Sequence, residues 1–335
     1  MTGRRDRAAR ALARPGLRAI ARRLPRWRGA IVLNYHRIGD RTGQPWDRTL
    51  WNVTAEMFDA QMEILAREAE VIGPAELLEL ARRPRRGRRV LLTFDDGYRD
   101  NHEVAFPILR RHGLTAAFFP ATAYIDGRLV PWWDELAWLV HRSPRQEIGA
   151  GELSGAPLPL GPEQDETVAL LVERYKSLSA ERTEDYLERV AEATGTSRCR
   201  PQDCASQWMT WEQLRELHAA GMSIGGHTVT HPILARLGAA EQRREIAGAG
   251  ERLREELGAP MRWFAYPVGS ADSFTTETQR LLREQGVELA FSFHGGFADL
   301  TRWEPLAVPR VHASPSHGPE LLRAMLALPR LFTSW

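Results

Sequence analysis

Short apolar runs alternate with helix-like segments along most of this chain, and the alternation restricts the folds that it can adopt. Residues 30–36 (AIVLNYH) and 88–97 (RRVLLTFDDG) are typical of buried strands, and residues 54–68 between them show helical spacing behind a Thr54 cap. Further strands are predicted at 114–120, 222–226, 262–266, 289–293 and 307–311, and further helices at 104–111, 211–220, 233–257 and 275–285. This rhythm favours an α/β fold with a parallel sheet.

One long segment, residues 127–206, departs from this rhythm. It contains an amphipathic stretch, PWWDELAWLV (131–140), a Gly- and Pro-rich stretch (143–163) and one or two polar helices (164–193). We interpret it as a mostly helical insertion in a single domain that spans residues 29–335. The tryptophans of 131–140 either line a groove for sugar rings or pack in a core.

Composition narrows the class of protein. The chain has 335 residues, of which 43% are hydrophobic and 26% charged, which excludes a disordered or fibrous protein. No uncharged apolar run reaches the ~20 residues that a membrane-spanning helix needs. Two cysteines, Cys199 and Cys204, are too few for a disulfide framework. They are expected to be ordinary thiols, with one surface disulfide as the alternative.

The first 28 residues form a basic arm. They hold ten arginines and one acid, Asp6, so their charge is about +9, although the whole chain is only +2. Arginine interrupts every apolar stretch of the arm, so no cleavable signal peptide is expected. We expect a cytoplasmic protein with peripheral contact to the inner membrane face, or else a solvated leader. Nucleic-acid binding is not expected, because no aromatic residues interleave the charges.

Two histidines four residues apart are the first candidates for metal ligands. In HTVTH, His227 and His231 can share a metal ion only if their donor nitrogens lie about 3–3.5 Å apart. An extended strand would separate them by ~13 Å, whereas a helical turn places them on one face. The pair is therefore expected on a turn after Gly225–Gly226, with Pro232 in the first turn of the next helix. Two unrelated polar histidines remain the alternative.

Two adjacent carboxylates, Asp95 and Asp96, follow the apolar run VLLTF and precede Gly97. Burying two anions is costly unless a cation or hydrogen bonds compensate for the lost solvation. One carboxylate can ligate a metal while the other stays free to accept a proton. The alternative is a structural pair that caps a helix or closes an Asx turn.

Taken together, TFDDG, HTVTH and FAYPVG (264–269) resemble three motifs of the polysaccharide deacetylase family, in the family's order. This family is also called the NodB-homology family or carbohydrate esterase family 4. The resemblance covers roughly residues 30–126 and 205–315. It implies a distorted (β/α) barrel with the site at the C-terminal ends of the strands.

The resemblance also implies roles for individual residues. Asp96, His227 and His231 would be the metal ligands, and Asp95 would be the general base. The metal would be divalent, with zinc best suited to these ligands and cobalt or nickel as alternatives.

The third motif, FAYPVG, would supply the oxyanion site and the substrate groove. Tyr266 would lend a backbone N–H to the oxyanion, and Pro267 and Gly269 would shape the groove. The arginine that often opens this motif in the family is missing, because the chain has Trp263–Phe264–Ala265 there. Arg310, in VPRV, is our candidate to orient the base in its place, and a surface ion pair is the alternative.

A general acid must come from elsewhere, because the C-terminal leucine–histidine motif of the family is also missing. LNYHRI (33–38) resembles the Y-H motif of the poly-N-acetylglucosamine deacetylase branch, in which the motif order is permuted. We therefore assign the general acid to His36 and keep His312, in VHA, as the second choice. An ordinary strand-end histidine is the alternative for His36.

The resemblance implies metal-dependent hydrolysis of an N-acetyl group from an amino sugar of a polysaccharide or glycan precursor. An O-acetyl esterase or a hydrolase of a non-sugar amide could use the same site. A glycan-binding module without activity is a further alternative, but a pure binder needs no base beside its metal. An N-acetylated glycan is therefore the expected partner.

Overall fold

The computed structural model describes residues 26–151, 153–314 and 318–333. The predicted basic arm lies outside these residues, except for its last three. Within the described part of the chain, no helix is both long enough and apolar enough to cross a membrane. Cys199 and Cys204 are both buried and not joined by a disulfide, so the alternative of a surface disulfide is wrong.

A twisted sheet at the centre of the molecule follows the predicted strands. Its order is β12-β1-β5-β6-β9, and β13 and β4 pair with β1 and β5. These strands are β1 (Gly29–Tyr35), β4 (Glu70–Val71), β5 (Arg89–Asp96), β6 (Ala117–Pro120), β9 (Ser223–Ile224), β12 (Ala298–Asp299) and β13 (Val311–His312). All pairs are parallel except β1 with β12. β1 and β5 are buried along their whole length, as expected of strands covered on both faces.

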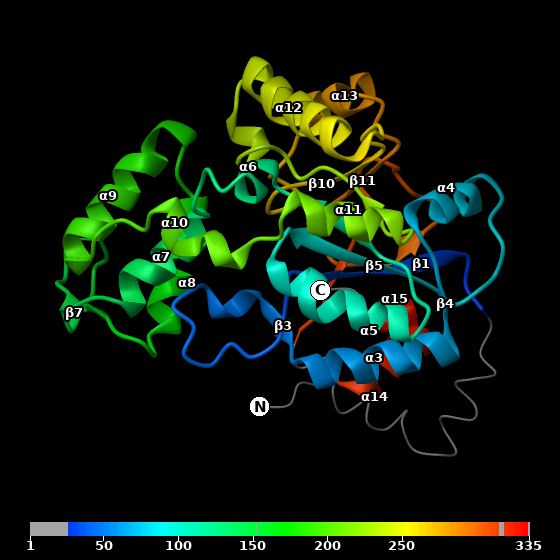
Figure 1. Ribbon diagram of the computed structural model, residues 1–335, viewed down its shortest axis with the longest axis horizontal. Coiled ribbons are helices and arrows are strands. Elements are labelled where there is room, and N and C mark those ends of the chain that lie inside the picture. Colours follow the sequence, from blue (N-terminus) through cyan, green and yellow to red (C-terminus); the bar gives the residue numbers. More distant parts are fainter. Residues whose placement is uncertain (1–25, 152, 315–317, 334–335) are drawn as a thin grey trace.

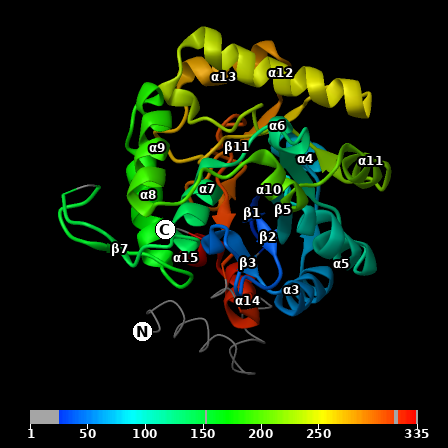
Figure 2. The same ribbon diagram turned by 60° about the vertical axis from the view of Figure 1, so that its left-hand side comes forward.

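The sheet closes into a distorted barrel through a short pair of strands and two isolated bridges. β10 (Trp263–Ala265) and β11 (Leu289–Phe291) pair in parallel, and bridges join Gly226 to Phe264 and Phe291 to Val308. The chain then reaches β13, which pairs with β1 and completes the ring. The fold is therefore the α/β class with the distorted (β/α) barrel that was predicted, and helices surround the strands (Figure 2).

Helices cover the outside of the barrel. They are α3 (Ala55–Glu68), α4 (Pro74–Arg82), α5 (Phe106–Arg111), α6 (Thr122–Ile125), α11 (Trp211–Ala219), α12 (Ala239–Leu257), α13 (Thr276–Glu284), α14 (Pro319–Ala327) and α15 (Pro329–Phe332). In α3, the Thr54 hydroxyl accepts a hydrogen bond from the Met57 N–H, as expected of an N-cap. Phe58, Met62 and Leu65 are fully buried against the sheet, and each such burial contributes about 1.5–3 kcal/mol.

Between β6 and β9 the chain forms a helical body beside the barrel (Figure 1, left). Its elements are α7 (Trp132–His141), β7 (Glu147–Ile148), β8 (Leu158–Pro159), α8 (Asp165–Lys176), α9 (Thr183–Thr194) and α10 (Pro201–Cys204). Apolar side chains of these helices form a core of their own, which includes Leu136, Leu171 and Leu187. We call residues 127–206 the insertion. It contacts the barrel through Tyr98 and Tyr124, which belong to the same core.

Several predicted boundaries are wrong. The helix expected over 233–257 begins only at Ala239, after a separate turn of 3-10 helix at Leu234–Arg236. Gly238 caps α12, and the Glu241 carboxylate accepts a hydrogen bond from the Gly238 N–H. The last strand is Val311–His312 rather than 307–311, and α5 is preceded by a π-helical turn, Asn101–Ala105. Local capping groups decide these boundaries, and periodicity alone does not detect them.

Candidate active site

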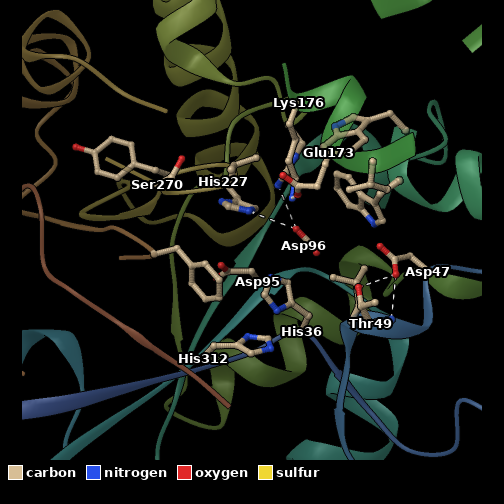
Figure 3. A pocket seen from close by; sticks show the side chains of 18 of the residues that line it. His36, Asp47, Thr49, Asp95, Asp96, Glu173, Lys176, His227, Ser270 and His312 are labelled. Carbon is tan, nitrogen blue, oxygen red and sulfur yellow. Dashed lines mark hydrogen bonds and ion pairs between the residues drawn. The ribbon is translucent and has the colours of Figure 1, made fainter. Parts of the chain in front are cut away.

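The predicted site residues gather where the parallel strands end. A cavity of about 470 Å³ opens there, and its lining includes all of the predicted metal, base and acid residues (Figure 3). His36 follows β1, Asp95 and Asp96 end β5, and His227 follows β9. Because the carboxyl ends of parallel strands meet at one rim, residues far apart in the sequence converge there.

Asp96, His227 and His231 form a compact cluster, which we call the triad. The Asp96 Oδ1 atom lies 3.3 Å from His227 Nε2 and 3.4 Å from His231 Nε2. All three side chains are buried, and their potential donor atoms lie within 4.8 Å of one another. No other group of three or more such side chains in the described part of the chain has this geometry.

The chemistry of the triad fits a cation. His227 Nδ1 donates a hydrogen bond to the Ala265 carbonyl oxygen at 2.7 Å, so the lone pair of this imidazole lies on Nε2, toward Asp96. Asp96 Oδ1 is buried and has no hydrogen-bond partner among the described residues. An unpaired carboxylate oxygen facing imidazole nitrogens is costly to bury, and a divalent ion bound between them would compensate for that cost.

The pKa values of the triad also fit a set of metal ligands. Burial raises the pKa of Asp96, but His227 and His231 outweigh it and lower that pKa to about 2. Burial and the charge of His227 lower the pKa of His231 to about 3. Burial also lowers the pKa of His227, but Asp96 and Asp95 outweigh it and raise that pKa. At neutral pH the site therefore holds an ionised Asp96 carboxylate and a neutral His231 imidazole, both of which have lone pairs for a metal ion.

The two triad histidines lie on a tight loop that is not helical, so that part of the prediction is wrong. Thr228 and His231 have positive φ angles of 67° and 59°, and the Thr228 hydroxyl accepts the His231 N–H at 2.9 Å. Glu245 of α12 accepts the N–H groups of Val229 and Thr230 at 2.9 and 2.8 Å. Left-handed backbone brings positions i and i+4 together here without a helical turn. Sequence reasoning missed Glu245.

Backbone strain is concentrated at the site. Among the described residues, only four residues other than glycine have a positive φ angle, namely Asp96, Thr228, His231 and Val268. Left-handed φ angles cost a non-glycine residue roughly 1–2 kcal/mol. All four belong to the triad, to its loop or to the cavity wall. Surrounding packing therefore holds the site in a conformation that the local sequence disfavours.

Asp95 is held by two buried partners. The Arg310 Nη1 atom donates to Asp95 Oδ1 at 2.8 Å, and the Asn34 Nδ2 atom donates to Asp95 Oδ2 at 3.2 Å. Arg310 is in turn fixed by Asn34 Oδ1 at 2.9 Å and by the Ser292 carbonyl oxygen at 2.9 Å. Burial raises the pKa of Asp95, but the Arg310 charge and His227 outweigh it, so the pKa lies below its usual value.

Arg310 is therefore no surface residue, and it contacts the predicted base. Sequence reasoning missed Asn34, although an amide inside the apolar run AIVLNYH is a visible signal. A buried amide must find partners. It finds them in Asp95, Arg310 and Thr93.

His36 and His312 both line the cavity on the side of Asp95 (Figure 3). Their ring centroids lie 6.1 Å apart, and Phe293 packs edge-on against both rings. The His36 Nδ1 atom is buried and has no hydrogen-bond partner among the described residues. Both candidates for the general acid are thus within the same site.

The oxyanion assignment to Tyr266 is wrong. Its N–H donates to the Phe291 carbonyl oxygen at 3.0 Å, as part of the contact between β10 and β11, so it is not available to a substrate. Pro267 has no N–H to donate. The next amide, that of Val268, makes no backbone hydrogen bond with the described residues, and Val268 lines the cavity with a φ angle of 62°.

Pro267 and Gly269 do shape the turn at this point. The Gly269 N–H donates to the Pro267 carbonyl oxygen at 2.6 Å, and Gly269 has a φ angle of 69°. A Cβ atom on Gly269 would lie 2.6 Å from the Phe293 side chain, so the close approach requires glycine.

The insertion supplies a wall of the cavity. Trp132 and Trp133 of α7 belong to the insertion core, which confirms the core reading of WWDELAW, and they also line the cavity. That they line a groove for sugar rings stays a prediction. The Trp133 ring lies 4.5 Å from the His231 ring, edge to face, and its Nε1 atom donates to the Tyr98 hydroxyl at 2.9 Å. Tyr98 in turn donates to Asp134 at 2.9 Å. From α8, the lining residues are Ala169, Val172, Glu173 and Lys176, which sequence reasoning missed.

Comparison with known proteins agrees with the fold. An α/β barrel with a buried Asp–His–His triad at its rim is a candidate metal site. The sequence profile described as polysaccharide deacetylase matches residues 82–151 and 165–300, more than half of the chain. The chain therefore belongs to the polysaccharide deacetylase family.

Individual relatives are distant. A Bacillus subtilis (strain 168) protein named as a polysaccharide deacetylase, YxkH, is 53% identical over 30 residues, which span 9% of this chain and 11% of that protein. The Streptococcus pyogenes deacetylase PplD, solved with acetate, is 18% identical, with a TM-score of 0.58, and the match covers 87% of this chain and 95% of PplD. IcaB from Ammonifex degensii is 22% identical, with a TM-score of 0.54, over 90% and 98% of the two chains. These two structures share the fold.

Proposed function

We propose that this protein is a metal-dependent deacetylase that removes N-acetyl groups from an amino sugar of a polysaccharide or glycan precursor. The observation that carries the proposal is Asp95, a buried carboxylate beside the triad that Arg310 holds in place and ionised. A ligand-binding site needs no such base. Membership of the polysaccharide deacetylase family and the likeness in fold to two deacetylases support the reaction class.

Asp96, His227 and His231 would hold the metal, and zinc suits a site with two imidazoles and one carboxylate. When bound, such an ion lowers the pKa of a water molecule and polarises a carbonyl group. Asp95 would take the proton of the attacking water, and its hydrogen bonds from Arg310 and Asn34 fix the direction of its oxygen atoms.

The developing oxyanion needs a hydrogen-bond donor from the chain itself. We assign this role to the Val268 N–H, which follows Pro267 and belongs to the cavity wall. One such donor contributes about 3–4 kcal/mol to stabilisation of the transition state. His36, protonated, would give its proton to the departing amine.

An amine is a poor leaving group without a proton, and this favours N-deacetylation over the O-acetyl alternative. An alkoxide leaves more readily, so an esterase has less need of a general acid such as His36. His36 is partly exposed in the cavity and its buried Nδ1 atom has no hydrogen-bond partner among the described residues, which is consistent with a group that exchanges protons with a substrate.

Release of acetate from chitin oligomers tests the proposal. We expect the zinc-loaded protein to release acetate, a metal chelator to stop the release, and added zinc to restore it. Acetylated xylan in a parallel assay distinguishes ester from amide hydrolysis. Release from xylan alone would contradict N-deacetylation, and release that is insensitive to the chelator would contradict the metal.

The pH profile of the rate distinguishes His36 from His312 as the general acid. The alkaline limb of the rate profile reports deprotonation of the general acid. We expect His36→Ala to lower kcat by ~10²-fold and to remove the alkaline limb, as loss of a general acid does. His312→Ala is the matched control, because the two rings are neighbours in one cavity. If His312→Ala removes the limb and His36→Ala keeps it, the acid is His312.

A further inference from the structure

The cavity wall that the insertion supplies contains the single lysine of the chain. Of the 45 lysine and arginine residues, 44 are arginines and one is Lys176. Lys176 is the last residue of α8, and it lines the same cavity as the triad. Composition alone would favour arginine at this position, as at every other cationic position, so a lysine here calls for a chemical reason.

Local structural roles do not supply that reason. A cation in the last turn of a helix interacts favourably with the helix dipole, but arginine serves that purpose in this chain at Arg67 of α3, Arg254 of α12 and Arg283 of α13. Lys176 also pairs with Glu173 at 2.8 Å, three residues earlier on α8. Arginine makes the equivalent pair three residues away from Glu79 in α4.

The position of the pair suggests contact with a ligand. Figure 3 shows Lys176 and Glu173 on the opposite side of the cavity from His36 and His312, with Asp96 and His227 of the triad between them. The side chain of Lys176 is 34% exposed and that of Glu173 is 72% exposed, so both are open to a molecule that enters the cavity. A sugar whose acetyl group reaches the triad would extend toward one of these two sides.

Charge decides which kind of group the pair can bind. Glu173 neutralises Lys176 at 2.8 Å, and Asp47 adds another carboxylate to the cavity wall. The wall therefore carries no excess positive charge for a phosphate or a carboxylate. An ammonium group that donates and a carboxylate that accepts, side by side, suit the hydroxyl groups of a neutral sugar. A compact ammonium has three rotatable donors, whereas the planar fork of arginine suits anions.

We propose that Lys176 and Glu173 form a subsite for a second sugar ring, next to the ring whose acetyl group is removed. The Lys176 ammonium donates to an oxygen of that ring, and the Glu173 carboxylate accepts from one of its hydroxyls. The subsite rests on the proposed function, because the triad must hold the acetyl group for the second ring to reach α8. It makes the insertion part of the substrate-binding surface.

Kinetics with substrates of two sizes test the subsite. We expect Lys176→Met to lower kcat/KM for chitotetraose about 10- to 100-fold, the usual effect of losing a hydrogen bond to a charged group, chiefly through KM. Hydrolysis of 4-nitrophenyl acetate should change less than threefold, because this ester has no second ring. Lys176→Arg should restore less than half of the chitotetraose activity. Arg174→Met is the matched control, since Arg174 is exposed on the same helix and does not line the cavity.

Equal losses with chitotetraose and the small ester would overturn the subsite, because they would indicate damage to the triad. An unchanged kcat/KM for chitotetraose in Lys176→Met would also overturn it. Full activity of Lys176→Arg would indicate that only the charge matters, which contradicts recognition by a compact ammonium.

Because Lys176 carries the only side-chain amine, reductive methylation followed by mass spectrometry gives a readout that does not depend on turnover. We expect chitotetraose to slow methylation of Lys176 at least fivefold in Asp95→Asn, where the fully acetylated substrate persists and contains no amine to consume the reagent. Lack of protection would overturn the subsite. Protection without turnover by the wild-type protein would support the subsite and overturn the deacetylase. Turnover without protection would overturn the subsite alone.

Discussion

Asp95→Asn is expected to retain one bound metal ion per chain and to lose roughly 10²- to 10⁴-fold in kcat, the usual contribution of a general base. The asparagine amide has nearly the shape of the carboxylate but cannot accept the proton of the attacking water. The triad does not include Asp95, so its three side chains stay in place. Metal content by atomic spectrometry and acetate release from chitin oligomers measure the two effects separately.

A control is needed because the substitution also breaks a buried ion pair, which can destabilise the fold. Asp126→Asn is the matched variant, since Asp126 pairs with Arg252 at 3.0 Å and lies outside the cavity lining. It should lower the melting temperature without a comparable loss of kcat. Activity of Asp95→Asn within about tenfold of the wild type would show that Asp95 is not the base.

Replacement of both triad histidines should remove the metal altogether. His227→Ala/His231→Ala leaves Asp96 as the only ligand of the three, and one carboxylate cannot hold a divalent ion against dilution. We expect no bound metal after dialysis and no activity above background. His218→Ala is the control, because His218 is exposed on α11.

Thermal unfolding gives an independent measurement for the same double variant. A ligand that binds only the folded state stabilises it by about 2.7 kcal/mol at one hundred times its Kd. Zinc should therefore raise the melting temperature of the wild type and of His218→Ala and leave that of the double variant unchanged. Stoichiometric metal in the double variant would refute the triad as the binding site.

The sequence was sufficient for those features that depend on local order. Apolar runs located the main strands, and the Thr54 cap located the start of α3. The motifs located the triad, because Asp96 ends β5, His227 and His231 follow β9, and parallel strands end at one rim. Strand ends do not account for Arg310, which immediately precedes β13.

Other features depend on partners that are distant in the sequence. The Tyr266 N–H is occupied by Phe291, a neighbour that exists only once β10 and β11 pair. Asn34 and Arg310 are 276 positions apart and still share a hydrogen bond of 2.9 Å. The positive φ angle of His231 also contradicts its local preference. No pattern of residue types along one segment contains this information.

The site is built from two parts of the chain, the barrel and the insertion, and this has a consequence for how such proteins diversify. The triad, Asp95 and Arg310 all come from the barrel, whereas the wall with Trp133, Glu173 and Lys176 comes from one continuous stretch of chain between β6 and β9. A single exchange of genetic material could therefore replace that wall and leave the reacting groups untouched. The exchanged segment would have to keep an anchor for Tyr98, whose hydroxyl bonds to Trp133 and Asp134 directly behind the triad. Chimaeras made at these boundaries would inherit the reaction from one parent and the choice of glycan from the other.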